Sequence, residues 1–291
     1  MLRSIAFLPL AALLAASPTL TASAAQPVAA VAARGERVLQ LQQGSNFRDL
    51  GGYPAAGGKH VRWGMIYRSG GTPLLTDADL AKIKTLGLAN MVDLRSSEER
   101  VLAPSRIEGV PYSAIGYSMG NMMSMDPAKL VGGDRMGTLY EEFPTFLKPQ
   151  AKLVFAKLLQ KEGPLVYNCS AGQDRTGFVS ALVLSALGVP RATIIEDYHL
   201  STTWRRPEYE MGRINLAAHP GNAAAELFAR GQDLPAEARK PTPLKTSDGR
   251  AYLEYALAAI DRRWGSVDAY LRQEIGLTNA DIASLRVTYL Q

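Results

Sequence analysis

Apolar residues along the chain fall into short runs separated by longer segments with helical spacing. The short runs predict four strands, at residues 38–42, 65–68, 89–95 and 164–167, the first of which alternates apolar and polar positions. Because strands alternate with helices, the pattern predicts an α/β fold with a central sheet flanked by helices and a helical C-terminal layer. The predicted helices cover residues 77–86, 139–147, 149–159, 175–187, 190–203 and 251–264, with two more that begin near 266 and 278.

Residues that favour helix ends support these boundaries. Thr76 and Ser266 stand directly before predicted helices, where a side-chain oxygen can accept a hydrogen bond from a free backbone N–H group. Gly87 and Gly188 follow predicted helices, at a position where helices commonly end. We therefore expect these four residues to mark helix ends that depend only on nearby sequence.

The first 25 residues have the composition of an export signal. Arg3 gives a positive start, residues 5–16 are almost wholly apolar, and residues 22–24 (Ala-Ser-Ala) form a small-residue cleavage pattern. We predict a secretory signal cut after residue 24 or 25, and hence a periplasmic or secreted protein. The alternative is an uncleaved membrane anchor, which the short apolar run disfavours, so no stable membrane insertion is expected after signal removal.

Beyond the signal, the sequence predicts one domain. Residues 26–36 are rich in Ala and Val without a clear period and predict a flexible tail. Residues 37–291 form the predicted folded domain. Within it, residues 218–248 shift to Pro, Gly, Ala and mixed charge, which indicates an insertion or lid rather than a separate domain.

Charge narrows the classes of partner only slightly. The chain has 32 Lys and Arg against 27 Asp and Glu, a net charge of +5, and loss of residues 1–25 leaves +4. A modest positive charge favours an anionic substrate, and without a dense Lys/Arg run we expect no nucleic acid partner. His60, His199 and His219 show no metal-ligand spacing, so no metal and no organic cofactor is expected.

The single cysteine, Cys169, is the main candidate for chemistry. A lone cysteine cannot form an internal disulfide and is commonly a small core residue. Its neighbours favour another interpretation, because residues 168–177 (Asn-Cys-Ser-Ala-Gly-Gln-Asp-Arg-Thr-Gly) lie between a predicted strand and a predicted helix. There, successive backbone N–H groups converge at the positive end of a helix dipole, which suits a dianion and favours the thiolate form of the cysteine.

This loop contains the residue types that phosphoryl transfer needs. The Cys169 thiolate is a nucleophile toward phosphorus, and the planar guanidinium of Arg175 can hold two phosphate oxygens as they gain charge. Gly172 lets the backbone curl closely around the ligand, and Thr176 can donate its hydroxyl to the sulfur when the phosphocysteine is hydrolysed. The other predicted phosphate-binding residues of the loop are Ser170, Ala171 and Gln173.

The order Cys, five residues, Arg-Thr and Gly resembles the signature of cysteine-based protein tyrosine and dual-specificity phosphatases. Segments 46–52 (Asn-Phe-Arg-Asp-Leu-Gly-Gly), 92–96 (Val-Asp-Leu-Arg-Ser) and 276–282 (Gly-Leu-Thr-Asn-Ala-Asp-Ile) are similar to the secreted bacterial tyrosine-protein phosphatase family, which has mycobacterial members. These motifs span most of the chain. The resemblance implies a cysteine-phosphatase-like sheet and hydrolysis of phosphomonoesters through a phosphocysteine, with phosphotyrosine on proteins the favoured substrate.

The resemblance also implies a general acid, which must protonate the leaving alkoxide or phenoxide. The similar secreted enzymes use an Asp immediately before the loop Arg, and Asp174 occupies that position. The alternatives are Asp126, Asp134 and Glu141, in an upstream segment that could fold over the site.

Three more residues have roles implied by the same resemblance. Arg48 and Asp49 are expected to order the substrate entrance, and the alternative is that they form a surface ion pair. Asp93, at the end of a buried strand, is expected to anchor Arg175 or Gln173 from behind.

Two departures from the family pattern bear on the substrate class. The family usually has His before the nucleophile, whereas this chain has Asn168, which cannot become cationic. Relatives that act on phosphoinositides often carry Lys where this chain has Gln173, so binding of multiply phosphorylated lipids should be weaker. A phosphoinositide or inositol-phosphate phosphatase and a catalytically silent phosphate-binding module remain alternatives. A sulfurtransferase or arsenate reductase is disfavoured, because arsenate reduction would need further cysteines.

Overall fold

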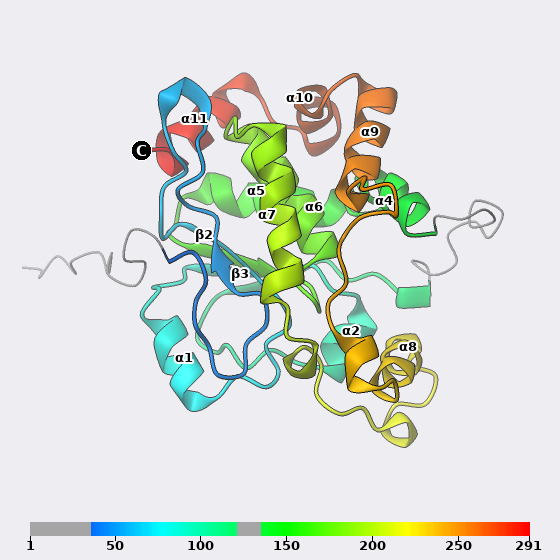
Figure 1. The fold of residues 1–291 in the computed structure, drawn as a ribbon. Coiled ribbons are helices and arrows are strands. Elements are labelled where there is room, and N and C mark those ends of the chain that lie inside the picture. Colours follow the sequence, from blue (N-terminus) through cyan, green and yellow to red (C-terminus); the bar gives the residue numbers. More distant parts are fainter. Residues whose placement is uncertain (1–35, 121–134) are drawn as a thin grey trace, which may run out of the picture.

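A computed structural model describes residues 36–120 and 135–291 (Figure 1). A five-stranded sheet with the order β1-β2-β5-β3-β4 lies at the centre. β1 pairs antiparallel with β2, and the pairs β2–β5, β5–β3 and β3–β4 are parallel. The predicted α/β fold with a central sheet is confirmed. The strands are β1 (Arg48–Asp49), β2 (Ile66–Ser69), β3 (Asn90–Asp93), β4 (Tyr112–Ala114) and β5 (Leu165–Asn168).

Helices cover the sheet and make up most of the C-terminal half. In Figure 1, α5, α6 and the C-terminal helices lie above the sheet and α1 lies below it, so the predicted helical C-terminal layer is present. No helix among the residues described has the length and apolar character needed to cross a membrane. The helices are α1 (Asp77–Lys84), α2 (Ser97–Leu102), α4 (Arg135–Phe146), α5 (Lys148–Gln160), α6 (Asp174–Ala186), α7 (Arg191–Trp204), α8 (Ala223–Gln232), α9 (Tyr252–Trp264), α10 (Val267–Tyr270) and α11 (Asn279–Tyr289).

The central strands place alternate side chains in two apolar clusters, one on each face of the sheet. In β5, Leu165 and Tyr167 enter the larger cluster, and Val166 enters the smaller one together with Ile83 of α1. Cys169 continues this alternation just after the strand, on the face of the larger cluster. The period-two geometry of the strand therefore decides which side of the sheet the sulfur faces.

Most predicted helix ends hold, because they depend on neighbouring residues. The exceptions are α1, predicted to run to residue 86, which ends at Lys84, and α4, predicted to begin at residue 139, which includes Arg135. The Thr76 hydroxyl accepts a hydrogen bond from the backbone N–H of Asp79, and the Ser266 hydroxyl accepts one from Ala269. Gly87 and Gly188 both have positive φ angles just after their helices. These contacts close within one turn of the chain, so the sequence pattern alone could locate them.

Three features near the N-terminus differ from the prediction. Residues 38–42 are not a strand: Val38 forms a single bridge to Arg48, and Leu41 packs into the smaller cluster. Segment 46–52, expected to be a loop, contains the short strand β1. β4 and α2 carried no prediction. Partners distant in sequence decide the conformation of residues 38–42, β1 and β4, which local periodicity cannot show.

The expected insertion at residues 218–248 contains α8 and folds beside α2 (Figure 1). The side-chain amide of Asn222, the N-cap of α8, donates to the backbone carbonyl of Glu98 in α2 at 3.4 Å. Near the end of the segment, Leu244 is buried in the larger cluster. The segment is therefore tied both to the core and to α2.

Candidate active site

The loop that carries Cys169 connects the carboxyl end of β5 to the start of α6. β5 is hydrogen bonded to β2 on one side and to β3 on the other, and Asp174 is the first residue of α6. Gly172 has a φ of +63°, and a Cβ there would lie 2.5 Å from the backbone of Ser69 and Gly70. The loop therefore lies at the free N–H groups of α6, as predicted, and its tight turn requires glycine.

Arg175 is held in place by a carboxylate that the sequence analysis did not identify. Its two terminal nitrogens donate to Glu99 at 2.6 and 2.7 Å, and one of them also donates to the Tyr117 hydroxyl at 2.6 Å. Glu99 also accepts the Ser170 hydroxyl at 2.6 Å. Burial alone would raise the pKa of Glu99, but Arg175 and Ser170 lower it to about 2. The carboxylate stays ionised and fixes both loop residues.

A capping box at the start of α2 orients Glu99. The Ser96 hydroxyl accepts from the backbone N–H of Glu99 at 3.1 Å, and the Glu99 carboxylate accepts from the backbone N–H of Ser96 at 2.9 Å. The sequence Ser96-x-x-Glu99 is the usual signature of this motif, so it was a signal that could have located α2. It could not have shown that the same carboxylate binds Arg175.

Asp93 has a different role from the predicted one. Its carboxylate accepts from the Arg95 guanidinium at 2.7 Å and from the Tyr112 hydroxyl at 2.8 Å. Asp93 therefore fixes the turn between β3 and α2, and the prediction that it anchors Arg175 or Gln173 is wrong. Arg175 is anchored by Glu99 instead, because α2 directs the Glu99 carboxylate toward the loop.

Arg48 and Asp49 are fully buried, so neither orders a substrate entrance and the alternative of a surface ion pair is also wrong. Arg48 donates through Nε to Asp197 at 3.2 Å, and Asp49 accepts the backbone N–H groups of Gly51 and Gly64 at 2.7 and 2.6 Å. Both residues belong to β1, which is buried and pairs with β2, and both stabilise structure beneath the site.

Behind the loop, amide and guanidinium groups hold its carbonyl oxygens. The Asn46 side chain donates to the carbonyls of Ala171 and Gly172 at 3.1 and 2.8 Å, and Arg68 donates to that of Gly172 at 2.8 Å. Arg68 is also paired with Asp197 at 2.5 Å. Burial would raise the pKa of Asp197, but the two arginines hold it below its usual range. With these carbonyls bound from behind, the loop N–H groups are left for a ligand in front.

Asp174 is the candidate acid that the structure places at the loop. Its Oδ1 accepts the Tyr140 hydroxyl at 2.5 Å and the Gln173 amide at 3.2 Å. Glu141 pairs instead with Arg262 of α9 at 3.1 Å. The other two alternatives, at positions 126 and 134, lie outside the described residues.

Cys169 and Thr176 lie at the base of the loop. Cys169 is 1% exposed, and its sulfur interacts electrostatically with Arg175 and Arg205. The buried Thr176 hydroxyl has no hydrogen-bond partner among the described residues, so the predicted donation to the Cys169 sulfur is not seen in this structure. Asn168 directs its amide nitrogen to the Cys169 carbonyl at 3.4 Å, so it supports the loop backbone.

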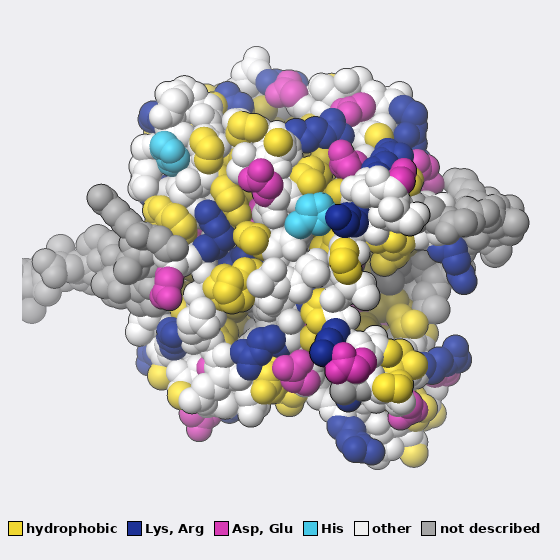
Figure 2. Space-filling model, in the orientation of Figure 1, with side chains coloured by type: hydrophobic (Ala, Val, Ile, Leu, Met, Phe, Trp, Pro, Cys, Tyr) yellow, Lys and Arg dark blue, Asp and Glu magenta, His cyan; other side chains and the backbone are white. Residues whose placement is uncertain are grey.

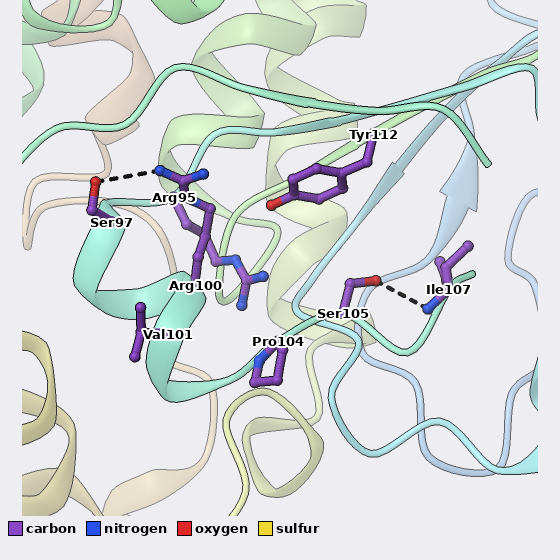
Figure 3. A pocket seen from close by; sticks show the side chains of 8 residues that line it. All are labelled: Arg95, Ser97, Arg100, Val101, Pro104, Ser105, Ile107 and Tyr112. Atoms are coloured by element: carbon purple, nitrogen blue, oxygen red, sulfur yellow. Dashed lines mark hydrogen bonds between the residues drawn. The ribbon is translucent and has the colours of Figure 1, made fainter. Parts of the chain in front are cut away.

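A hollow of about 520 Å³ lies on the other side of α2 (Figure 3). Within it, Arg100 donates to the Ser97 hydroxyl at 3.3 Å. None of the predicted site residues lines the hollow, so we assign it no part in the reaction. Its lining residues are Arg95, Ser97, Arg100, Val101, Pro104, Ser105, Ile107 and Tyr112.

Comparison with known proteins identifies the family of the chain. The model of the tyrosine phosphatase family matches residues 39–291. A Cupriavidus necator protein that carries the name tyrosine-protein phosphatase is 35% identical over 278 residues, covering 91% of this chain and 93% of the relative. The triple specificity protein phosphatase PtpB of Mycobacterium tuberculosis is 29% identical over 284 residues, covering 86% of this chain and 98% of the relative.

A crystal structure of P. aeruginosa TpbA is 16% identical with a TM-score of 0.30, and the match covers 62% of this chain and 88% of TpbA. That similarity is too low for a comparison of sites. The family match extends over nearly the whole described chain and includes the loop with Cys169 and Arg175. The chain therefore belongs to the tyrosine phosphatase family, and it is a hydrolase.

Proposed function

We propose that this enzyme hydrolyses phosphotyrosine through a phosphocysteine intermediate. The observation that carries the proposal is the two-pronged hydrogen bonding of Arg175 by Glu99, beside the loop whose base is Cys169. This contact holds the guanidinium in one plane, so that its other edge, formed by Nε and Nη2, can donate to the phosphate oxygens. An ordered cation at the reacting phosphoryl group stabilises the charge that develops in the transition state.

In the first step, Sγ of Cys169 attacks phosphorus, and an S–P bond forms as the ester P–O bond breaks. The leaving phenoxide takes a proton from Asp174. In the second step, water attacks the phosphocysteine and gives its proton to Asp174, and the S–P bond breaks to release phosphate. The Thr176 hydroxyl, which is unpaired in the described structure, stabilises the departing thiolate.

The loop favours a single phosphate over a multiply phosphorylated lipid. Gln173, in the position of the Lys of phosphoinositide-active relatives, uses its carbonyl oxygen to accept from Arg205 at 2.8 Å. Arg205 is itself neutralised by Glu210, at 2.9 Å from two of its nitrogens. No uncompensated cation is therefore added by these three residues for a second phosphate, which supports phosphotyrosine as the substrate.

The proposal also covers the location of the enzyme, its partner and the role of residues 218–248. The export-signal pattern of residues 1–25 supports a periplasmic or secreted location. Figure 2 shows a face on which Lys and Arg side chains are interspersed with Asp and Glu, so this face offers no continuous basic surface to nucleic acid. The family match supports a phosphorylated partner. α8 packs against α2, the helix that carries Glu99, so a lid formed by residues 218–248 would act beside the partner of Arg175.

A substitution of the nucleophile tests the proposal, in protein lacking residues 1–25. Cys169→Ser should abolish release of phosphate from a phosphotyrosine peptide, because a serine hydroxyl at this position has no comparable anionic form. Binding of tungstate, a phosphate analogue, should persist because the loop and Arg175 remain.

The same measurement separates the alternatives. Unchanged turnover in the variant would refute the phosphocysteine pathway. A wild-type protein that binds tungstate but releases no phosphate would instead be a silent binding module. Faster release from phosphoinositides or inositol phosphates than from phosphopeptides would overturn the substrate assignment.

A further inference from the structure

A chain of buried hydrogen bonds ends on the carboxylate of Asp174. The Tyr140 hydroxyl lies 2.5 Å from Oδ1 of Asp174 and 2.7 Å from the Tyr198 hydroxyl. Both tyrosines are almost fully buried, and they belong to α4 and α7, far apart in sequence. A carboxylate accepts but does not donate, so the Tyr140 hydroxyl must donate its hydrogen bond to Asp174, and Tyr198 must donate to Tyr140.

The phenol of Tyr140 keeps this proton at any pH at which the enzyme works. Burial, followed by the neighbouring Asp174 and Tyr198, raises the pKa of Tyr140 well above its usual value. The hydroxyl is therefore a permanent donor toward Oδ1.

A second donor reaches the same oxygen from Gln173. The guanidinium of Arg205 can only donate, so the amide oxygen of Gln173 must face it, at 2.8 Å. The amide nitrogen then points to Oδ1 of Asp174, at 3.2 Å. Glu210 holds Arg205 through two hydrogen bonds and also accepts the Ser45 hydroxyl at 3.0 Å, so the amide cannot turn over without breaking this arrangement.

Both donors act on Oδ1, and Oδ2 of Asp174 accepts no hydrogen bond within the described part of the chain. An amide nitrogen cannot accept a proton, so a protonated Asp174 carries its hydrogen most favourably on Oδ2. We propose that Tyr140 is a positioning residue for the acid–base step, which with Gln173 reserves Oδ2 of Asp174 for the proton that passes to the leaving group. This inference rests on the proposed role of Asp174 as general acid.

The final glycine of the loop motif fits this arrangement. A Cβ on Gly177 would lie 2.9 Å from the ring of Tyr198, so glycine is needed for the tyrosine to approach α6. The rings of Tyr140 and Tyr198 then meet edge to face, with centroids 6.1 Å apart. The motif that carries Cys169 and Arg175 thus also makes room for the hydrogen-bond chain.

The test is the dependence of kcat/KM on the leaving group, which reports steps up to cleavage of the P–O bond. Phenyl phosphate needs a proton on its leaving oxygen, whereas 4-nitrophenyl phosphate hardly does. For Tyr140→Phe we expect kcat/KM to fall about tenfold with phenyl phosphate and less than about twofold with 4-nitrophenyl phosphate. Tyr198→Phe should show the same pattern with a fall of about threefold for phenyl phosphate, since it acts through Tyr140.

Tyr289→Phe is the matched control. Its hydroxyl is equally buried and donates to the Leu158 carbonyl at 2.8 Å, on α5 rather than at Asp174. It should change kcat/KM for both substrates by the same factor. Thermal unfolding of each variant shows that the protein measured is folded.

Asp174→Asn separates failure of this inference from failure of the general-acid assignment. It should lower kcat/KM for phenyl phosphate by about a hundredfold or more, with a much smaller effect on 4-nitrophenyl phosphate. Equal losses for both substrates in this variant would refute Asp174 as the acid. If Asp174→Asn shows the selective loss but Tyr140→Phe lowers both substrates equally or neither, the positioning role of Tyr140 is refuted while the acid remains.

Discussion

Two groups of Arg and carboxylate side chains hold the loop that carries Cys169, one at its mouth and one beneath it. At the mouth, Glu99 faces Arg175 in a one-to-one pair, and the arginine side chain is 10% exposed. Beneath the loop, Asp197 faces both Arg48 and Arg68, and all three side chains are at most 1% exposed. Both groups pair guanidinium with carboxylate, but they differ in the ratio of arginines to carboxylates and in exposure to solvent.

The difference indicates which group can take part in the reaction. Arg175 is within reach of a ligand, so a phosphate can add to the interactions that Glu99 already makes. The lower group has no such access, and its extra positive charge is used to bind the Gly172 carbonyl. Buried ion pairs are costly to assemble and costlier to break, so the lower group has mainly a structural role.

The largest effect is expected from breaking the lower group. Asp197→Asn leaves two buried guanidinium groups without an anion, and we expect it to lower the free energy of unfolding by about 3–5 kcal/mol. Urea unfolding monitored by tryptophan fluorescence measures this loss. Saturating tungstate should recover little of the lost free energy of unfolding when the variant is compared with the wild type under the same conditions. A loss below about 1 kcal/mol, the range of exposed pairs, would contradict the structural role.

A smaller loss of stability and a clear loss of activity are expected at the mouth. Glu99→Gln keeps one acceptor for Arg175 but removes the charge, and it should lower the free energy of unfolding by about 1–3 kcal/mol. Because Arg175 is then less well aligned, kcat/KM should fall about ten- to a hundredfold. Asp268→Asn, which breaks an exposed Asp–Arg pair on α10, is the control that should leave kcat/KM unchanged. Wild-type activity in Glu99→Gln would show that the contact is not needed for catalysis.

The smallest effect concerns pH. The pKa of Glu99 is lowered from 4.5 to about 2, so its contribution to stability is present above about pH 4.5 and is lost as the pH falls toward 2. The unfolding free energies of wild type and Glu99→Gln should therefore converge between pH 5 and pH 3. Asp49, whose pKa burial raises to about 6, acts with the opposite sign, but it is present in both proteins and cancels in the difference. A constant difference across this range would contradict an ionised Glu99.

The loop itself was predictable because its parts are neighbours in the sequence. Cys169, Arg175 and the candidate acid Asp174 lie within seven consecutive residues, and the strand-to-helix pattern that frames them has clear periodicity. Gly172 was predicted to allow close approach of the backbone. In the structure it lies against the backbone of Ser69, the last residue of β2, and of Gly70 in the turn that follows.

The supporting residues were not predictable in the same way. Asp93 and Glu99 are both acidic residues near the end of β3, and the sequence gives no reason to prefer the second as the partner of Arg175. The rotation of α2, set by its capping box, makes the choice. Arg48 and Asp49 were expected at the substrate entrance from the family resemblance. Charged residues are seldom buried unless paired, and the partner of Arg48, Asp197, lies 149 residues away in the sequence.

The sequence by itself predicted the candidate nucleophile and the candidate phosphate-binding arginine and located most helix ends, because each depends on residues within a short stretch of the chain. Only the tertiary structure decided which carboxylate holds Arg175, which groups bind the loop carbonyls and which oxygen of Asp174 is left free. These depend on β1, α2, α4 and α7 meeting around one loop. The physical reason is that a buried charge or hydroxyl takes whatever complementary group the packing brings to it, and packing joins residues that the chain keeps far apart.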